Sequence, residues 1–340
     1  MDNPVLVEVT RGNLIESRHR GSIAIVDETG HLVFGIGDVE QGVFPRSAIK
    51  VLQALPLVES GAADALDYDE AELALACASH NGEEVHAKTA RMMLRKAGLS
   101  EDSLLCGEQW PTLMHDIIQL IENKEKPCPL HNNCSGKHAG FLGLARVMGI
   151  STENYVDYDH PVQKEIRNVL EAMTGEILGS EHCGTDGCSI PTYAIALNKT
   201  ARAFACFGTG EGLDPVRANA AETLFEACVN EPYMVAGKQR FCTDIMHAFK
   251  GRAFVKHGAE GVFCASIPEL GFGVTLKCDD GTIRASEVMM ASVLDSLLDT
   301  NDEETAGLSP WLTQPLESRR GKQVGEVRPV KDFSQLLKNL

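Results

Sequence analysis

Short runs of alternating apolar and polar residues mark the first forty positions of the chain. The stretch from Leu6 to Val9 alternates, and the runs GSIAIVD and HLVFGIG follow it, separated by the turn residues ETG. Two such runs joined by a tight turn predict a β-hairpin. We therefore expect the chain to begin with strands.

From Pro45 to about residue 250 the apolar positions recur every three to four residues, which is the period of an amphipathic helix. The segments with this period are AIKVLQALPLVESG, AKTARMMLRKAG, MHDIIQLIEN, HAGFLGLARVMG, HPVQKEIRNVLEAM and NAAETLFEACV. The middle of the chain is predicted to be mostly helical.

Strand-like runs return near the end of the chain. They are GVFCASI, GFGVTLKC and GTIRASE, followed by a helical segment at residues 288–298 and by GKQVGEVRPV, which resembles a last edge strand. Because strands come from both ends, we expect an α/β (α+β) fold with one mainly antiparallel sheet flanked by helices. A single domain would contain a sheet lobe, 1–44 and 251–340, and an inserted helical lobe, 45–250, with the cleft where they meet.

The composition is that of an ordinary globular protein. Of 340 residues, 44% are hydrophobic and 23% are charged, and no apolar run approaches the roughly 18 residues of a membrane span. The first residues show no basic flank followed by an apolar block, so no signal peptide is expected. These features predict a soluble, cytoplasmic protein.

Charge and cysteine content narrow the classes of partner. A net charge of −17 disfavours nucleic acids and anionic membranes, which require a basic patch. Eleven cysteines, an odd number, are scattered without the dense framework of a small secreted scaffold. We expect most of them to be reduced.

Ser47 and Lys50 lie where the strand region gives way to the first helix, in the segment PRSAIK. Three residues make almost one helical turn, so the two side chains share a face, and an uncharged Lys50 could accept the proton of the Ser47 hydroxyl. The S-x-x-K spacing alone is common, and a helix-capping serine beside a solvated lysine explains it as well.

Two further short motifs follow in the chain. Ser79-His80-Asn81 ends an Ala/Leu/Cys run before a glycine, and a helix end capped by Asn and Gly is the alternative interpretation. Lys256-His257-Gly258 begins a loop before GVFCASI and resembles the K-T-G element of serine hydrolases that act on penicillins. The order of the three motifs favours a serine–lysine hydrolase in which Ser79 relays a proton and Lys256 polarises the site.

Cysteines also stand in two glycine-containing segments, LHNNCSGKHAGFLG and GTDGCSIPTY. Thiolates and a nitrogen ligand suit zinc, and spacing alone favours Cys134, His138, Cys183 and Cys188 as ligands. The segments lack paired C-x-x-C motifs, so buried core cysteines beside loop glycines explain them equally well.

Seven segments resemble successive blocks of the asparaginase II family over about residues 8–327. They are HRGSIAIVD, FPRSAIK, CASHNGE, NNCSGKHAG, HPVQ, DGCSIPTY and KHGAEGV. The resemblance to the rhizobial-type L-asparaginases of this family implies a fold related to the serine β-lactamases and glutaminases, and a homodimer. Val51 and Ser189 depart from the pattern, since relatives often carry proline and glycine there, but neither change removes a functional group.

The resemblance also implies which residues act in catalysis. The two Ser–Lys pairs of the family fall on Ser47 with Lys50 and on Ser79 with Lys256. The implied hypothesis is that Lys50 activates Ser47, which attacks the side-chain carboxamide of L-asparagine. Ammonia then leaves and water hydrolyses the ester.

A zinc ion, Zn²⁺, is a further implication of the resemblance. The metal ligands of the family are two cysteines and a lysine, which fall here on Cys134, Cys188 and Lys137 and displace His138. A lysine can ligate only as the neutral amine, so the metal must hold its pKa down. Two thiolates and one amine leave the site formally neutral, with room for a water.

A zwitterionic substrate needs a cation for its α-carboxylate and an anion for its α-ammonium group. Arg46 and Asp186 are the obvious pair, although Arg46 could be a surface cap and Asp186 a turn residue. His80 and Asn81 are weaker candidates for substrate binding, since local capping explains them nearly as well.

Two other functions stay open from the sequence. The three short motifs also fit a glutaminase or a penicillin-interacting serine hydrolase. A zinc-dependent binding protein whose serines are helix caps is the non-enzyme alternative.

Overall fold

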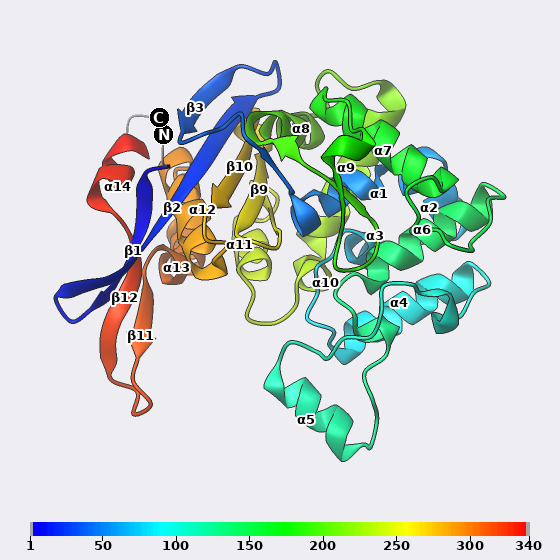
Figure 1. Ribbon diagram of the computed structural model, residues 1–340, viewed down its shortest axis with the longest axis horizontal. Helices are drawn as coiled ribbons and strands as arrows, with labels where there is room; N and C mark the ends of the chain where they lie inside the picture. The colour runs from blue at the N-terminus through cyan, green and yellow to red at the C-terminus, as the bar shows by residue number, and fades with distance from the viewer. Residues whose placement is uncertain (1–2, 338–340) are drawn as a thin grey trace.

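The computed structural model describes residues 3–337 (Figure 1). It contains one antiparallel sheet of eight strands. The strands run in the order β11-β12-β1-β2-β10-β9-β8, and β3 also pairs with β2. They are β1 (Val5–Arg11), β2 (Leu14–Asp27), β3 (Leu32–Ile36), β8 (Phe254–His257), β9 (Val262–Ile267), β10 (Phe272–Cys278), β11 (Gln314–Glu317) and β12 (Gln323–Pro329).

Helices fill most of the chain between β3 and β8. They are α1 (Lys50–Glu59), α2 (Ala62–Ala65), α3 (Glu70–Ala76), α4 (Glu84–Lys96), α5 (Met114–Glu122), α6 (Ser135–Val147), α7 (Pro161–Thr174), α8 (Leu197–Thr209), α9 (Pro215–Asn230), α10 (Pro232–Val235) and α11 (Phe241–Phe249). After the last central strands come α12 (Ile283–Leu297), α13 (Asp302–Leu312) and α14 (Lys331–Leu337). Every helix among residues 3–337 is too short or too polar to cross a membrane.

The two ends of the chain meet inside the sheet. Val7 of β1 lies opposite Pro329 of β12, and the second half of β2 pairs with β10. Figure 1 accordingly shows β1 and β12, from opposite ends of the colour scale, side by side. The predicted antiparallel sheet from both ends of the chain, flanked by helices, is confirmed.

The second half of β2 is apolar on both faces because helices cover both of them. Ala24 and Val26 form a buried cluster with Leu197 of α8. Ile23 belongs to the main core on the other face, where Met289 of α12 lies against the backbone of β2. The sheet is therefore the middle layer between α8 and α12.

The periodicity of the sequence located many elements correctly. The runs GSIAIVD and HLVFGIG form the β2–β3 hairpin, and the six helical segments correspond to α1, α4, α5, α6, α7 and α9. The middle of the chain also contains two small antiparallel sheets that the pattern did not predict. They pair β4 (Gly42–Val43) with β7 (Ile195–Ala196), and β5 (Cys183–Thr185) with β6 (Pro191–Tyr193).

Three element predictions were wrong. GTIRASE begins helix α12 rather than a strand, since alternation over only seven residues is too short to exclude a helix. GKQVGEVRPV forms β12, but β11 pairs with its outer side, so β12 is not an edge strand. Lys256 and His257 end strand β8 instead of beginning a loop.

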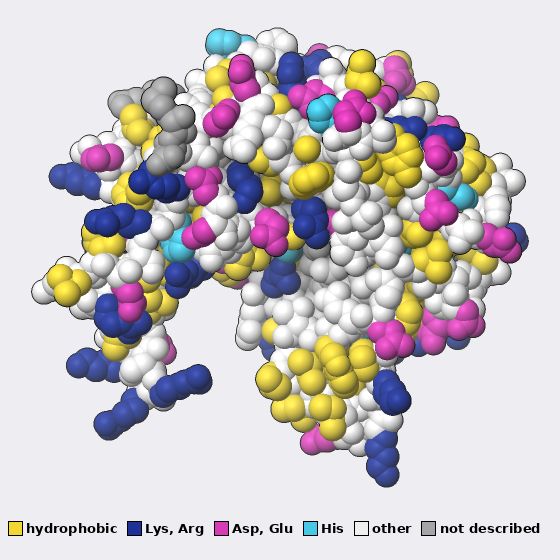
Figure 2. Space-filling model, in the orientation of Figure 1, with side chains coloured by type: hydrophobic (Ala, Val, Ile, Leu, Met, Phe, Trp, Pro, Cys, Tyr) yellow, Lys and Arg dark blue, Asp and Glu magenta, His cyan; other side chains and the backbone are white. Residues whose placement is uncertain are grey.

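Helix α5 stands apart from the rest of the molecule (Figure 1). None of its residues is buried, and Met114, Ile118 and Ile121 expose 68%, 47% and 59% of their surface. These side chains form an apolar patch on the projecting arm (Figure 2). The amphipathic pattern thus predicted the helix but not where its apolar face would lie.

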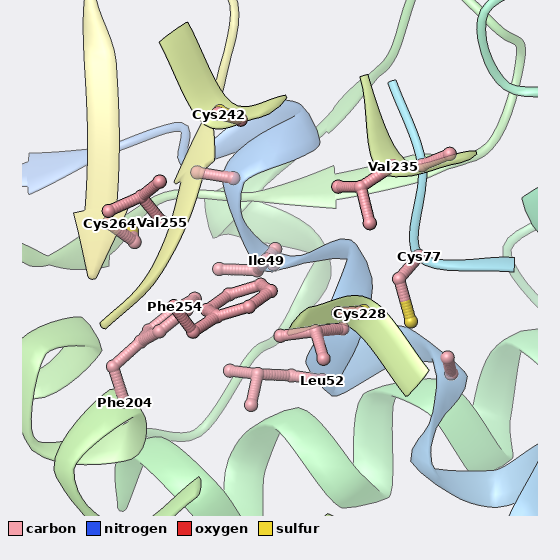
Figure 3. Close-up of a cluster of buried hydrophobic side chains, with 14 of the residues drawn as sticks. Ile49, Leu52, Cys77, Phe204, Cys228, Val235, Cys242, Phe254, Val255 and Cys264 are labelled. Atoms are coloured by element: carbon pink, nitrogen blue, oxygen red, sulfur yellow. The ribbon is translucent and has the colours of Figure 1, made fainter. Parts of the chain in front are cut away.

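The start of helix α1 is anchored in the main core. Ile49 and Leu52 are fully buried and lie beside Phe254 of β8 and Cys228 of α9 (Figure 3). This packing fixes the first turns of α1 against the sheet edge. The polar residues on the other face of those turns are thereby held in place.

Candidate active site

Ser47 sits in a tight 3₁₀ turn, η1 (Arg46–Ile49), that leads directly into α1. The turn is closed by the Ala48 N–H, which donates to the Pro45 carbonyl at 3.0 Å. Arg46 has a φ of 52°, in the left-handed region that non-glycine residues rarely adopt. Such strain, typically about 1–3 kcal/mol, accumulates at functional sites when the surroundings enforce it.

A narrow cavity lies beside Ser47. It is lined by Arg46, Ser47, Lys50, Gln53, Lys137, Asp186, Ile190 and Thr192. The structure therefore brings together a hydroxyl, three cationic side chains and one carboxylate from three different parts of the chain.

Lys50 is 1% exposed and makes three contacts through its ammonium nitrogen. Its Nζ donates to the Ala78 carbonyl at 2.6 Å, to the Asn133 carbonyl at 3.2 Å and to the Ser79 hydroxyl at 3.2 Å. Ser79 is itself fixed, because its N–H donates to the Val235 carbonyl at 2.9 Å. Lys50 thus contacts the second serine while facing the same cavity as the first.

Lys256 is fully buried at the end of β8. Its Nζ donates to the His257 carbonyl at 3.0 Å. Burial lowers the pKa of Lys256 to about 7, and the nearby Lys50 and Arg240 cations act in the same direction. Of the amines around the two serines, Lys256 can therefore become neutral near physiological pH.

Arg46 and Asp186 form an ion pair, with Nε 2.5 Å from Oδ2. Burial alone would raise the pKa of Asp186, but Lys137 and the hydrogen bond from Arg46 outweigh it and hold that pKa at about 2. The two residues expected to bind the charged ends of a zwitterion thus neutralise each other in this structure.

His80 and Asn81 are buried, and their polar atoms bond within the protein. The Gly82 N–H donates to His80 Nδ1, so His80 Nε2 carries the proton and donates to the Ser135 hydroxyl at 3.0 Å. Asn81 Nδ2 donates to the Lys238 carbonyl, and its Oδ1 accepts from Arg240. Both side chains fix loops around Ser79 in this structure.

Cys134, Lys137 and Cys188 form a buried cluster on one side of the cavity. The first two lie at the start of α6, and Lys137 Nζ is 3.1 Å from Cys188 Sγ. The hydrogen bond from Cys188 lowers the pKa of the Cys134 thiol well below its usual range, and Lys50 and Lys137 contribute to this. Two sulfurs, one already favouring the thiolate, and an amine are a donor set that fits zinc.

The zinc ligands suggested by spacing alone are not brought together. His138 Nδ1 lies 2.7 Å from the Tyr155 hydroxyl instead. Among residues 3–337, three His, Cys or acidic side chains meet at metal-binding distance only at His19, Cys278 and Asp280, far along the chain from these cysteines.

Arg240 lies near Asn81 and Lys256, although no motif in the sequence indicated it. Its guanidinium donates to Asn81 Oδ1 at 2.9 Å and to His257 Nε2 at 2.6 Å, beside Lys256. Cys242 is 1% exposed and lies 3.7 Å from His257 Nδ1.

Gln53 is the second residue that the motifs missed. It is 5% exposed, lines the cavity, and its Oε1 atom has no hydrogen-bond partner. A buried polar atom without a partner typically costs about 1–3 kcal/mol. Its spacing of three residues from Lys50 was the only signal in the sequence.

The sequence matches a protein-family model over most of its length. The model of the family described as L-asparaginase II matches residues 7–329. No curated protein sequence matches the chain. Among solved structures, a mutant of the simvastatin synthase LovD from Aspergillus terreus is similar over 76% of this chain and 86% of its own, with 10% sequence identity and a TM-score of 0.37. Similarity at that level supports no conclusion about chemistry.

Proposed function

Because the chain belongs to the L-asparaginase II family, we propose that it hydrolyses L-asparagine to L-aspartate and ammonia through a Ser–Lys acyl-enzyme. Family membership supports the coarser statement, an amidohydrolase acting on a small amide. The finer statement rests on one observation: the cavity beside Ser47 combines a nucleophile, buried amines and a pair of opposite charges.

The Arg46–Asp186 pair suits a zwitterionic substrate. When an amino acid enters, Arg46 turns to its α-carboxylate and Asp186 to its α-ammonium group, so each residue exchanges one ionic partner for another. The exchange leaves no charge unpaired inside the cavity. A neutral amide without these two charged groups gains nothing from opening the pair.

A proton path leads away from Ser47. In the proposed relay the Lys50 ammonium first passes a proton through the Ser79 hydroxyl, 3.2 Å away, to the neutral amine of Lys256, and the Lys50 amine that remains accepts the Ser47 proton. Lys256 can accept this proton because burial lowers its pKa to about 7. The path uses all four residues of the two Ser–Lys pairs.

Attack by Ser47 Oγ on the side-chain carbonyl forms a tetrahedral oxyanion. Its collapse breaks the C–N bond, and the relay returns a proton so that ammonia leaves. Water, activated by the same amines, then adds to the ester and releases aspartate. Backbone N–H groups near Ser47 are the natural oxyanion donors, and removing one such donor typically costs roughly 3–4 kcal/mol.

We include a zinc ion held by Cys134, Lys137 and Cys188 in the proposal. Bound there, the metal would supply a Lewis acid at the edge of the cavity. Burial would lower the pKa of Lys137, yet the Cys188 and Cys134 sulfurs raise it, so metal binding has to release this proton.

The alternative substrates are glutamine and a penicillin. Glutamine differs by one methylene, which pockets usually discriminate by only about 10–200-fold. A panel of asparagine, glutamine and a chromogenic β-lactam tests the two alternative hydrolases.

The decisive experiment compares ammonia release from L-asparagine by the wild type and by Ser47→Ala, with zinc supplied. We expect the variant to lose at least about a thousandfold in kcat while circular dichroism shows a folded protein. Ser100→Ala, an exposed serine far along the chain, is the matched control and should keep full activity.

Absence of ammonia release from the wild type would refute the asparaginase proposal. If the inactive protein still bound asparagine in calorimetry, the zinc-dependent binding protein would become the better interpretation.

The resemblance also supports a homodimer, and we include in the proposal both this homodimer and the cytoplasmic location expected from the sequence. All eleven cysteines are free, as a reducing compartment would keep them. Light scattering of the purified protein and fractionation of cells test these two points.

A further inference from the structure

Ser47, Lys50 and Gln53 recur every three residues along η1 and α1. A 3₁₀ turn has three residues per turn, and an α-helix has 3.6, so the three side chains stay on one face. All three line the same cavity. Two of them already have a proposed role there, and Gln53 has none.

Gln53 Oε1 is an acceptor that the protein leaves unused. Eight buried side-chain atoms among residues 3–337 have no hydrogen-bond partner, and Gln53 is the one residue among their owners that lines the cavity beside Ser47. Buried polar groups are almost always paired, so an orphaned acceptor at a cavity points to a ligand that donates.

The charges around Gln53 indicate what kind of donor that ligand carries. The cavity has cations at Arg46, Lys50 and Lys137 but a single carboxylate, Asp186, which is already paired with Arg46. A substrate α-ammonium group brings three N–H donors and needs more than one acceptor. Asp186 can supply one of them, and a second must come from an uncharged oxygen.

The carboxamide nitrogen of the substrate is a poorer partner for Gln53. It leaves as ammonia and must gain a proton as it leaves, which an amide oxygen cannot supply. The α-ammonium group keeps its donors throughout the reaction. We infer that Gln53 Oε1 accepts a hydrogen bond from the α-ammonium group and so makes the site selective for α-amino acids, an inference that rests on the proposed function.

Gln53→Met tests the inference, because methionine keeps the volume and removes the acceptor. For L-asparagine we expect kcat/KM to fall about 10- to 100-fold, the usual effect of losing a hydrogen bond to a charged group. For succinamic acid, which is asparagine without its α-ammonium group, kcat/KM should change less than about twofold. Inhibition by L-aspartate should weaken by the same factor as kcat/KM for L-asparagine falls, and inhibition by succinate should not change.

Gln53→Glu is the conservative variant. Its carboxylate restores an acceptor, so the preference for L-aspartate over succinate should survive. Gln163→Met is the matched control: Gln163 is equally buried, but its side chain donates to the Tyr155 carbonyl outside the cavity. This control should lower the melting temperature and leave the preference between the two inhibitors unchanged.

Two outcomes would overturn the inference in distinguishable ways. If Gln53→Met weakens aspartate and succinate equally, or neither, Gln53 only shapes the cavity, while the asparaginase activity of the wild type stands. If the wild type neither releases ammonia from asparagine nor binds aspartate, both the proposed function and the inference about Gln53 are wrong.

Discussion

Lys256 is fully buried near a second amine, and this placement opposes folding. Burial lowers its pKa to about 7, whereas a lysine in an unfolded chain titrates near 10.4. Between these two pH values the unfolded chain binds the proton and the folded protein does not. The free energy of unfolding therefore rises as the pH increases from about 7 to 10, and the full penalty remains below pH 7.

Lys256→Met should accordingly stabilise the protein while abolishing its activity. We expect a gain in the free energy of unfolding on the order of 3–5 kcal/mol at pH 6, which shrinks towards pH 10. Urea unfolding of both proteins at pH 6, 8 and 10, together with ammonia release, measures the two effects. Equal stability of the two proteins at pH 6 would mean that the buried amine is not destabilising.

Single residues were predictable from the sequence where a local motif existed. Ser47 and Lys50 lie within one turn, and the structure brings them to one cavity. Gln53 follows Lys50 at the same spacing of three residues, so the sequence already indicated that its side chain shares their face of the helix. Arg240 meets Asn81 across 159 positions of sequence, and no local pattern encodes such a contact.

At the scale of elements, the end of β8 and the turn η1 are in direct contact. Gly258 follows β8, and a Cβ atom there would lie 2.4 Å from the Pro45 carbonyl oxygen and 3.2 Å from the Ala48 nitrogen. The strand end therefore supports the turn that carries Ser47, and it can do so only because residue 258 has no side chain.

Gly258→Ala should displace this turn. We expect kcat to fall about 100-fold, as for a 1 Å misplacement of a reacting group, with a loss of stability of about 1–3 kcal/mol. Steady-state kinetics and thermal melting provide the two readouts. Gly42→Ala is the control, since its Cβ would meet Ala194 at an ordinary 3.7 Å; if both variants were equally active, Gly258 would not support the turn.

Whole elements were predicted well where one period extended over many residues, as in α7, whereas only the second half of β2, GSIAIVD, was predicted as a strand. The prediction failed for short segments. GTIRASE alternates like a strand, but its residues continue into α12, whose apolar side chains repeat at helical spacing. β11 has four residues including Pro315, and such a strand is recognisable only from its pairing with β12.

At the scale of the whole molecule, a metal at Cys134, Lys137 and Cys188 would join the start of α6 to the β5–β6 loop. Removing it with a chelator should lower the melting temperature by several degrees, and added zinc should restore it, because a ligand bound only to the folded state stabilises that state. Differential scanning calorimetry and zinc analysis, with about one ion expected per chain, test this.

Two variants separate the possible ligand sets. Cys134→Ser should abolish zinc binding, whereas Cys183→Ser, which alters a half-buried cysteine outside the proposed set, should keep it. Loss of zinc binding in Cys183→Ser would instead support the ligand set that spacing alone favoured, which includes Cys183.

The overall architecture followed from the sequence because both ends of the chain carry strand patterns, and strands need partners. The projecting arm at α5 did not follow from it. Its apolar residues repeat at helical spacing like those of a core helix, and only the three-dimensional structure shows that they face outward.

The pairing of β1 with β12 also affects how the protein can fold while it is being synthesised on the ribosome. Residues 7–9 of β1 cannot pair until residues 327–329 have been synthesised. At about 5–20 residues per second this takes roughly 15–60 s. Ile23 and Ile25, fully buried in the finished protein, lack their partners Leu276 and Val274 on β10 until about 250 further residues have been made. The N-terminal hairpin is therefore without its sheet partners for most of the synthesis of the chain.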